Sequence, residues 1–83
     1  MSSDPIPVTI EYSEPARFLS RAEALARALE AEGGVEVRLV EGRGGVFEVE
    51  VAGRLVYSRR ATFRFPSPDE ILYHVRAAIR RAT

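Results

Sequence analysis

The chain has no cysteine, lysine or tryptophan among its 83 residues, and it has a single histidine. Without cysteine there is no disulfide and no thiolate ligand, and one histidine cannot complete a zinc site, so we expect no metal and no cofactor. No stretch approaches the roughly 18 apolar residues of a membrane span, and residues 1–5 lack the basic start and apolar run of a leader. These absences predict a cytoplasmic protein without a membrane partner.

The short length predicts one domain covering residues 1–83. A chain of this size buries only about 60 to 65% of the surface that it exposes when unfolded, so side-chain packing alone must hold a modest core together. We therefore expect one small unit with neither repeats nor linkers.

Charge is balanced over the whole chain and uneven along it. Residues 1–50 contain five arginines and ten acids, whereas residues 51–83 contain seven arginines and two acids. The basic half could bind an anion or nucleic acid, or the two halves could complement each other. Because no recognition helix and no RNA-binding pattern accompanies the arginines, we favour complementary halves over nucleic-acid binding.

Hydrophobic periodicity predicts a strand, a helix and a second strand in the first half. Apolar and polar residues alternate over residues 6–12, which indicates a strand with one buried face. Residues 15–32 have helical spacing, with Pro15 suited to the first turn and Gly33 and Gly34 to the end. Alternation returns over residues 35–39. Strand, helix and strand with short connections predict a right-handed βαβ unit with parallel strands.

The second half begins with a predicted β-hairpin. Residues 46–51 and 55–58 alternate as strands, and Ala52-Gly53 forms the tight turn between them. The hairpin should lie at the edge of a mixed sheet. Residues 59–66, rich in arginine and phenylalanine, are expected to form a loop.

The last helix has a complete start signal. Ser67 is the expected N-cap, Pro68 takes the first helical position, and Glu70 completes a capping box. The residues expected on its buried face are Ile71, Leu72, Val75 and Ile79. The order β-α-β-β-β-α predicts an α/β protein of the α+β kind: a two-layer sandwich with a mixed four-stranded sheet and both helices on one face.

Several segments together resemble the selenoprotein W-related (Rdx) family. They are residues 8–12, 36–40, 42–49, 53–59 and 65–71, and the Gly-x-Gly-Gly-x-Phe-Glu-Val run within them is the most distinctive. The resemblance implies a thioredoxin-like fold. It also implies a Cys-x-x-Cys or Cys-x-x-selenocysteine motif after the first strand, and redox activity toward thiol partners such as glutathione.

The chain departs from this pattern at the residues that would carry the chemistry. A cysteine at a strand-to-helix junction has a lowered pKa because the helix start is positively polarised. The two family cysteines align with Ser13 and Ala16. Serine would need an activating base, and alanine cannot resolve a mixed disulfide. We therefore expect no catalytic residues here.

These observations favour a redox-inactive domain that acts as a protein-interaction module, with a second copy of itself as one candidate partner. The first alternative is a family thiol-disulfide oxidoreductase whose cysteines have been replaced, since Ser13 and Ala16 could be natural or engineered. The second alternative is an anion-binding or nucleic-acid-binding protein that uses the C-terminal arginines.

The candidate binding surface combines the arginine- and phenylalanine-rich loop with the end of the first strand. Exposed arginine and phenylalanine are typical of protein contacts. The family resemblance brings this loop close to the redox motif, so we expect Tyr12, Ser13, Phe63, Arg64 and Phe65 to border one patch. The alternative is that the phenylalanines tuck under the sheet and only stabilise the fold.

Three other features have structural interpretations that we prefer. Residues 42–45 are rich in glycine but lack the Lys-Ser/Thr ending of a phosphate-binding loop, so we expect a turn between strands. His74 has no second histidine or cysteine and should be a partly exposed structural residue. Ser13 could hold a small anion at the helix start, although a cap or turn role is favoured.

Overall fold

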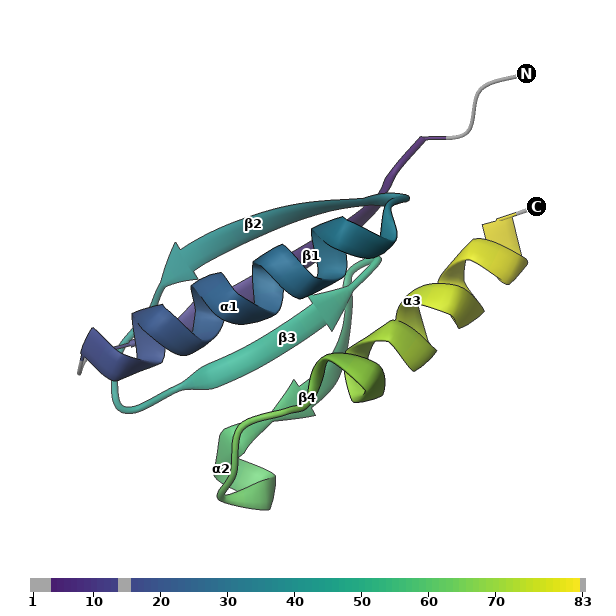
Figure 1. Ribbon diagram of the computed structural model, residues 1–83. Helices are drawn as coiled ribbons and strands as arrows, with labels where there is room; N and C mark the ends of the chain where they lie inside the picture. The colour runs from purple at the N-terminus through teal and green to yellow at the C-terminus, as the bar shows by residue number, and fades with distance from the viewer. Residues whose placement is uncertain (1–3, 14–15, 83) are drawn as a thin grey trace.

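The computed structural model describes residues 4–13 and 16–82. The elements follow the order β1 (Ile6–Tyr12), α1 (Ala16–Glu32), β2 (Val35–Glu41), β3 (Phe47–Val51), β4 (Arg54–Ser58), α2 (Arg59–Thr62) and α3 (Pro68–Ala82). Figure 1 shows α1 and α3 lying over the same face of the sheet. The predicted two-layer sandwich is confirmed, with α2 as an additional turn of helix. The expected role of Pro15 lies outside the described residues.

The sheet is mixed and has the strand order β2-β1-β3-β4. Strand β1 pairs in parallel with β2, beginning with Ile6 opposite Val35, and antiparallel with β3, with Val8 opposite Val51. The backbone N–H of Ile6 donates to the carbonyl of Gly34 at 2.8 Å, where the chain leaves α1 and enters β2. The parallel βαβ unit and the edge hairpin predicted from periodicity are both confirmed.

The turn of the hairpin has left-handed backbone at both central residues. Ala52 has φ 53° and Gly53 has φ 79°, the arrangement whose twist matches that of the two flanking strands. The β3–β4 register then shifts: Val49 faces Tyr57 while Glu50 faces Leu55. The extra residue between these pairs increases the local twist. It also lets Tyr57 point into the core while Leu55 is exposed.

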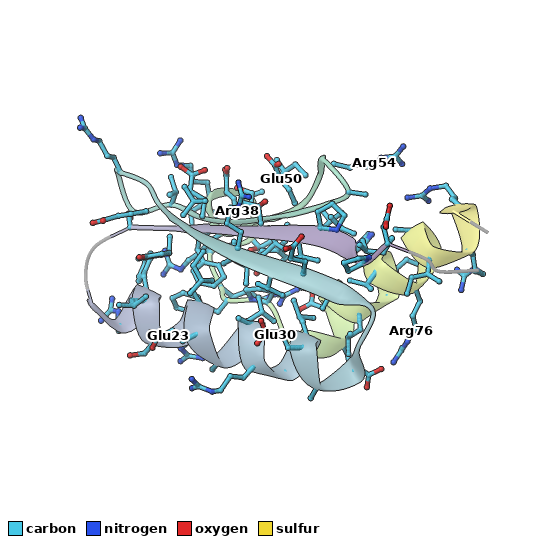
Figure 2. All side chains as sticks on the ribbon, turned by 90° about the horizontal axis from the view of Figure 1, so that it is seen from above. Glu23, Glu30, Arg38, Glu50, Arg54 and Arg76 are labelled. Carbon is cyan, nitrogen blue, oxygen red and sulfur yellow. The ribbon has the colours of Figure 1, made fainter. Side chains whose placement is uncertain are left out.

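The core lies between the sheet and the inner faces of α1 and α3. Its buried members are Ile6, Val8, Ile10, Phe18, Ala22, Leu25, Ala26, Leu29, Phe47, Val49, Val51, Tyr57, Ile71, Leu72, Val75 and Ala78. The outer side of the sheet is charged instead, and Figure 2 shows Arg38, Glu50 and Arg54 on the side opposite the helices. Each strand alternates apolar and polar residues, so one face of the sheet packs against the helices and the other face is exposed to solvent.

The expected burial of Ile79 is wrong, because its side chain is 38% exposed and Ala78 occupies the buried position. The last part of α3 extends past the strands (Figure 1), so the sheet no longer covers this turn. Ile79 lies beside Gly34 at the start of β2, with its Cδ1 3.6 Å from the position that a Cβ would take there.

The expectation that residues 59–66 form a loop is wrong at its start, where α2 forms. The Phe63 N–H donates to the Arg59 carbonyl at 2.6 Å and closes the turn. The Thr62 hydroxyl donates to the Tyr57 hydroxyl at 2.7 Å, and its oxygen also lies 3.2 Å from the Ser58 carbonyl. Four residues are too few for a helical period to be visible in sequence, and the local side-chain bond from Thr62 to Tyr57 stabilises the turn.

No helix in residues 4–13 and 16–82 is long and apolar enough to cross a bilayer.

Candidate functional site

The end of β1 is enclosed by the loop that joins β2 to β3. The Tyr12 carbonyl accepts the N–H of Gly42 at 2.6 Å, and the Ser13 N–H donates to the carbonyl of Val46 at 3.1 Å. Ser13 is only 2% exposed. The position that aligns with the first family cysteine is therefore built into the sheet end rather than presented to solvent.

The glycine loop is a turn between strands, as predicted. Gly44 and Gly45 both have positive φ, 75° and 76°, a conformation that residues with a Cβ rarely adopt. A Cβ on Gly42 would come within 2.8 Å of the Val46 side chain and would clash with the Glu11 carboxylate. An open cavity of about 530 Å³ lies between this loop and Ser13.

Ser13 and Ala16, the positions where we expect the family's cysteines to be replaced, lie at the junction between β1 and α1. Helix α1 begins at Ala16, and Glu14 and Pro15 lie outside the described residues. His74 is on α3, where its ring packs edge-on against Tyr73 at 5.2 Å. Within residues 4–13 and 16–82, no cluster of three histidine, cysteine or acidic side chains could hold a metal ion.

Three phenylalanine rings pack edge to face beneath the start of α1. The ring centroids of Phe65 lie 5.1 Å from those of both Phe18 and Phe47, and Phe18 lies 6.4 Å from Phe47. Tyr12 faces Phe47 across the β1–β3 ladder. The structure thus brings Tyr12 and Phe65 to one end of the sheet. Phe65 packs inward, which agrees with the alternative that the phenylalanines of this loop tuck under the sheet.

Phe63 has the opposite orientation, although it is only two residues from Phe65. Its side chain is 81% exposed, and its φ of 60° places it in the left-handed region. Such a conformation costs free energy for a residue with a Cβ, and it occurs preferentially at functional positions. The candidate patch therefore has one projecting aromatic ring and one anchored ring.

Arg64 is held by the capping box of α3. Its Nη1 and Nη2 donate to Oε1 and Oε2 of Glu70 at 2.9 and 2.7 Å. The N–H of Ser67 donates to Glu70 at 2.8 Å, and the N–H of Glu70 donates to Ser67 Oγ at 3.4 Å, which confirms the predicted capping box. The Arg64 guanidinium also lies 5.6 Å above the Tyr57 ring.

This arrangement shifts the acid–base behaviour of both partners. Hydrogen bonds from the Arg64 guanidinium, and then from the Ser67 N–H, lower the pKa of Glu70 to about 2. The same pairing with Glu70 raises the pKa of Arg64. Arg64 therefore positions the segment between α2 and α3, in addition to any contact that it makes with a partner.

The sequence analysis did not identify three arginines that surround the rings of Phe18 and Phe65. The guanidinium carbon of Arg59 lies 5.1 Å from the Phe18 centroid and 5.0 Å from that of Phe65. Arg21 lies 4.8 Å from the Phe65 centroid, and Arg17 lies 6.0 Å from that of Phe18. The spacing of Arg17 and Arg21 on one side of α1 was the available signal, but Arg59 joins them only through tertiary structure.

A family profile and two curated relatives resemble this chain. A family profile described as the Rdx family matches residues 7–77. Migration and invasion enhancer 1 of Bos taurus, and the protein of that name from Mus musculus, are each 32% identical to the chain over 72 residues. The match covers 86% of this chain, which spans only 63% of the length of these curated relatives.

Solved structures show the same architecture. A crystal structure of a protein from Bordetella parapertussis has a TM-score of 0.79 and 31% identity, covering 89% of this chain and 98% of that one. A selenoprotein W-related protein from Vibrio cholerae has a TM-score of 0.82 over 92% and 99% of the two chains; its 24% identity supports the fold alone. With a thioredoxin-like sandwich and a profile match over most of its length, the chain belongs to the Rdx family.

Proposed function

We propose that this chain is a redox-inactive domain of the Rdx family that binds a protein partner through the surface around Phe63. Its sequence contains no cysteine, so its side chains cannot form or resolve a mixed disulfide. As the composition suggests, we expect it to act in the cytoplasm. The proposal concerns this chain alone, because the two curated relatives are longer and contain sequence that this chain does not match.

The exposed ring of Phe63 is the observation that carries the proposal. Its side chain is 81% exposed, and its backbone is left-handed. Glycine and asparagine adopt left-handed backbone at lower cost than phenylalanine, so we would expect one of them at this position if only the fold mattered. A large apolar side chain that is both exposed and strained does not stabilise the fold, whereas aromatic anchors of this kind commonly carry binding energy.

The neighbouring residues keep the segment that carries this ring in one conformation. The Tyr57 hydroxyl donates to the Arg64 carbonyl at 2.5 Å, and the Thr62 hydroxyl donates to the Tyr57 hydroxyl at 2.7 Å. Phe65 anchors the chain on the other side of Arg64. A preorganised anchor loses little conformational entropy when a partner binds. Within the proposal, Tyr12, Ser13, Arg64 and Phe65 shape the surface, and Phe63 makes the main contact.

The test compares the Phe63→Asn variant with a Tyr73→Asn control. Asparagine tolerates left-handed backbone, so Phe63→Asn removes the ring and relieves the strain. Tyr73 is a second exposed aromatic residue, 65% exposed and located on α3. Proteins retained from a source lysate by the immobilised wild type and by Tyr73→Asn should be lost with Phe63→Asn. Identical retention by all three proteins would refute the proposal.

Self-association is tested with the same variants. If the partner is a second copy of the chain, sedimentation should show a dimer for wild type and Tyr73→Asn, and a monomer for Phe63→Asn.

The alternative of an oxidoreductase with replaced cysteines draws support from the family itself. It is distinguished by the source gene, which would encode Cys-x-x-Cys or Cys-x-x-selenocysteine where this chain has Ser13 and Ala16. Serine and alanine codons at these positions would instead support a natural redox-inactive protein.

A further inference from the structure

We propose that the arginine–phenylalanine cluster, formed by Arg17, Arg21, Arg59, Phe18 and Phe65, binds an acidic peptide segment of a protein partner, one apolar side chain of which enters the adjoining cavity. This inference rests on the proposed function, because it names the chemistry of the partner that the domain would bind.

The described part of the chain leaves the three arginines of the cluster without an ion pair. Among residues 4–13 and 16–82, no carboxylate forms an ion pair with Arg17, Arg21 or Arg59. Glu70 is engaged by Arg64 instead. The Nε of Arg59 is buried and has no hydrogen-bond partner within the described part of the chain. A carboxylate from a partner would supply the missing negative charge at Arg17 and Arg21, which are exposed, whereas the Nε of Arg59 is buried and out of its reach.

The rings hold the guanidinium groups without neutralising them. Arg21 and Arg59 lie 4.8 and 5.0 Å from the Phe65 centroid, distances at which a cation interacts favourably with a ring face. Phe65 itself packs at 5.1 Å against Phe47 in the core. The planar donors are therefore held on a fixed support, which favours forked contacts with carboxylates.

The sequence of α1 also departs from what helix stability alone would favour. The first turn of a helix favours acidic side chains because of its partial positive charge. The first turn of α1 contains no acid, and Arg17 occupies its second position. A cation at this end weakens the helix slightly and adds to the positive field of the cluster. Departures of this kind are expected at functional sites.

An apolar cavity of about 140 Å³ lies directly beside the cluster. Arg21 and Leu25 of α1 line one side, the rings of Phe47 and Phe65 form another, and Pro66 completes the wall. This volume is close to that of a cavity of about 150 Å³ that accommodates a benzene ring. Arg21 belongs to both the cavity and the cluster, so a single peptide can place an apolar side chain and a carboxylate there together.

The probe for the test is a short fluorescein-labelled peptide of glutamates with one central leucine, and binding is measured by fluorescence anisotropy. We expect affinity to fall steeply as salt rises, because the Debye length shortens from about 10 Å at 0.1 M to about 3 Å at 1 M. Replacing the leucine by alanine should weaken binding roughly tenfold, because the cavity contact is lost. A peptide with lysine in place of glutamate should not bind.

Matched protein variants locate the contact. The double variant Arg21→Gln with Arg59→Gln should weaken binding by roughly two- to thirtyfold. The control, Arg27→Gln with Arg54→Gln, removes the same charge from two exposed arginines outside the cluster and should bind like the wild type. Circular dichroism and thermal unfolding check that both proteins fold. The peptide substitutions test the site in the wild-type chain even if the first variant does not fold.

The outcomes separate this inference from the proposed function. Equal binding by both double variants, salt-independent affinity or binding of the lysine peptide would overturn the inference. So would a poly-uridylate strand that binds more tightly than the glutamate peptide, because the cluster would then be a nucleic-acid site. If Phe63→Asn still abolishes partner capture while the peptide results are negative, the proposed function stands and the acidic partner is rejected.

Discussion

Arg64 and Glu70 form a bidentate ion pair, with nitrogen–oxygen distances of 2.9 and 2.7 Å. Glu70 also accepts the N–H of Ser67, so one carboxylate both caps α3 and ties it to the segment after α2. This contact determines where the chain runs between Phe63 and the last helix. The pair is exposed, which means that its value lies in orientation more than in stability.

The pKa of Glu70 predicts a loss of stability in acid. The pKa is lowered from 4.5 to about 2 in the folded state. A lowered pKa means that the carboxylate stabilises the fold above pH 4.5, and that this contribution is lost as the pH falls from 4.5 toward 2. Thermal unfolding of Glu70→Gln should therefore be less sensitive to pH over this interval than that of the wild type. Parallel curves would contradict the prediction.

The left-handed alanine in the hairpin turn predicts a stabilising substitution. Ala52 has φ 53°, a conformation that asparagine and glycine adopt with less cost. Ala52→Asn should raise the free energy of unfolding by about 1 kcal/mol, as measured by urea denaturation. Ala52→Val should lower it, because a β-branched side chain is strained there. A valine variant as stable as the asparagine variant would argue against the turn geometry.

The three phenylalanines near the candidate site should rank by burial. Phe47 is buried, Phe65 is partly buried and Phe63 projects into solvent. Phe47→Ala should cost about 3 to 5 kcal/mol, a large share of the stability of a small domain. Phe65→Ala should cost less, and Phe63→Ala almost nothing. Urea unfolding of the three variants checks the order, and a large loss for Phe63→Ala would mean that its ring packs against the fold.

Restoring the family motif tests the alignment at the end of β1. Because the resemblance to the family implies a Cys-x-x-Cys motif at this junction, Ser13→Cys with Ala16→Cys should form a reducible intramolecular disulfide under mild oxidation. Thiol titration before and after oxidation measures it, with each single cysteine variant as the control. Free thiols in the oxidised double variant would mean that the motif aligns elsewhere.

Much of the fold was predictable because local patterns agreed with each other. The alternation in residues 6–12 and 35–39 and the helical spacing between them correctly indicated the parallel βαβ unit. The Ser67 to Glu70 signal correctly located the start of α3. The individual strands and helices are marked by local periodicity and capping preferences, and short connections between them favour the parallel unit.

The errors came from features that hydrophobic periodicity does not report. Ile79 fits the helical stripe of α3, yet its side chain is 38% exposed and Ala78 takes the buried position. The turn of helix α2 is stabilised by the bond of Thr62 to Tyr57 rather than by its own propensity. Neither the exposure of one position in a helical stripe nor a side-chain hydrogen bond within a short turn is visible in hydrophobic periodicity.

The amino-acid sequence by itself determined the order of the four strands and the two long helices, the family resemblance and the absence of a thiol at Ser13 and Ala16. Only the tertiary structure decided that Phe63 projects while Phe65 is anchored, and that Arg59 joins Arg17 and Arg21 over two rings. The physical reason is that backbone periodicity acts over a few residues. Side-chain direction in the segment before α3 depends instead on a left-handed residue, an ion pair and an aromatic core contributed by distant parts of the chain.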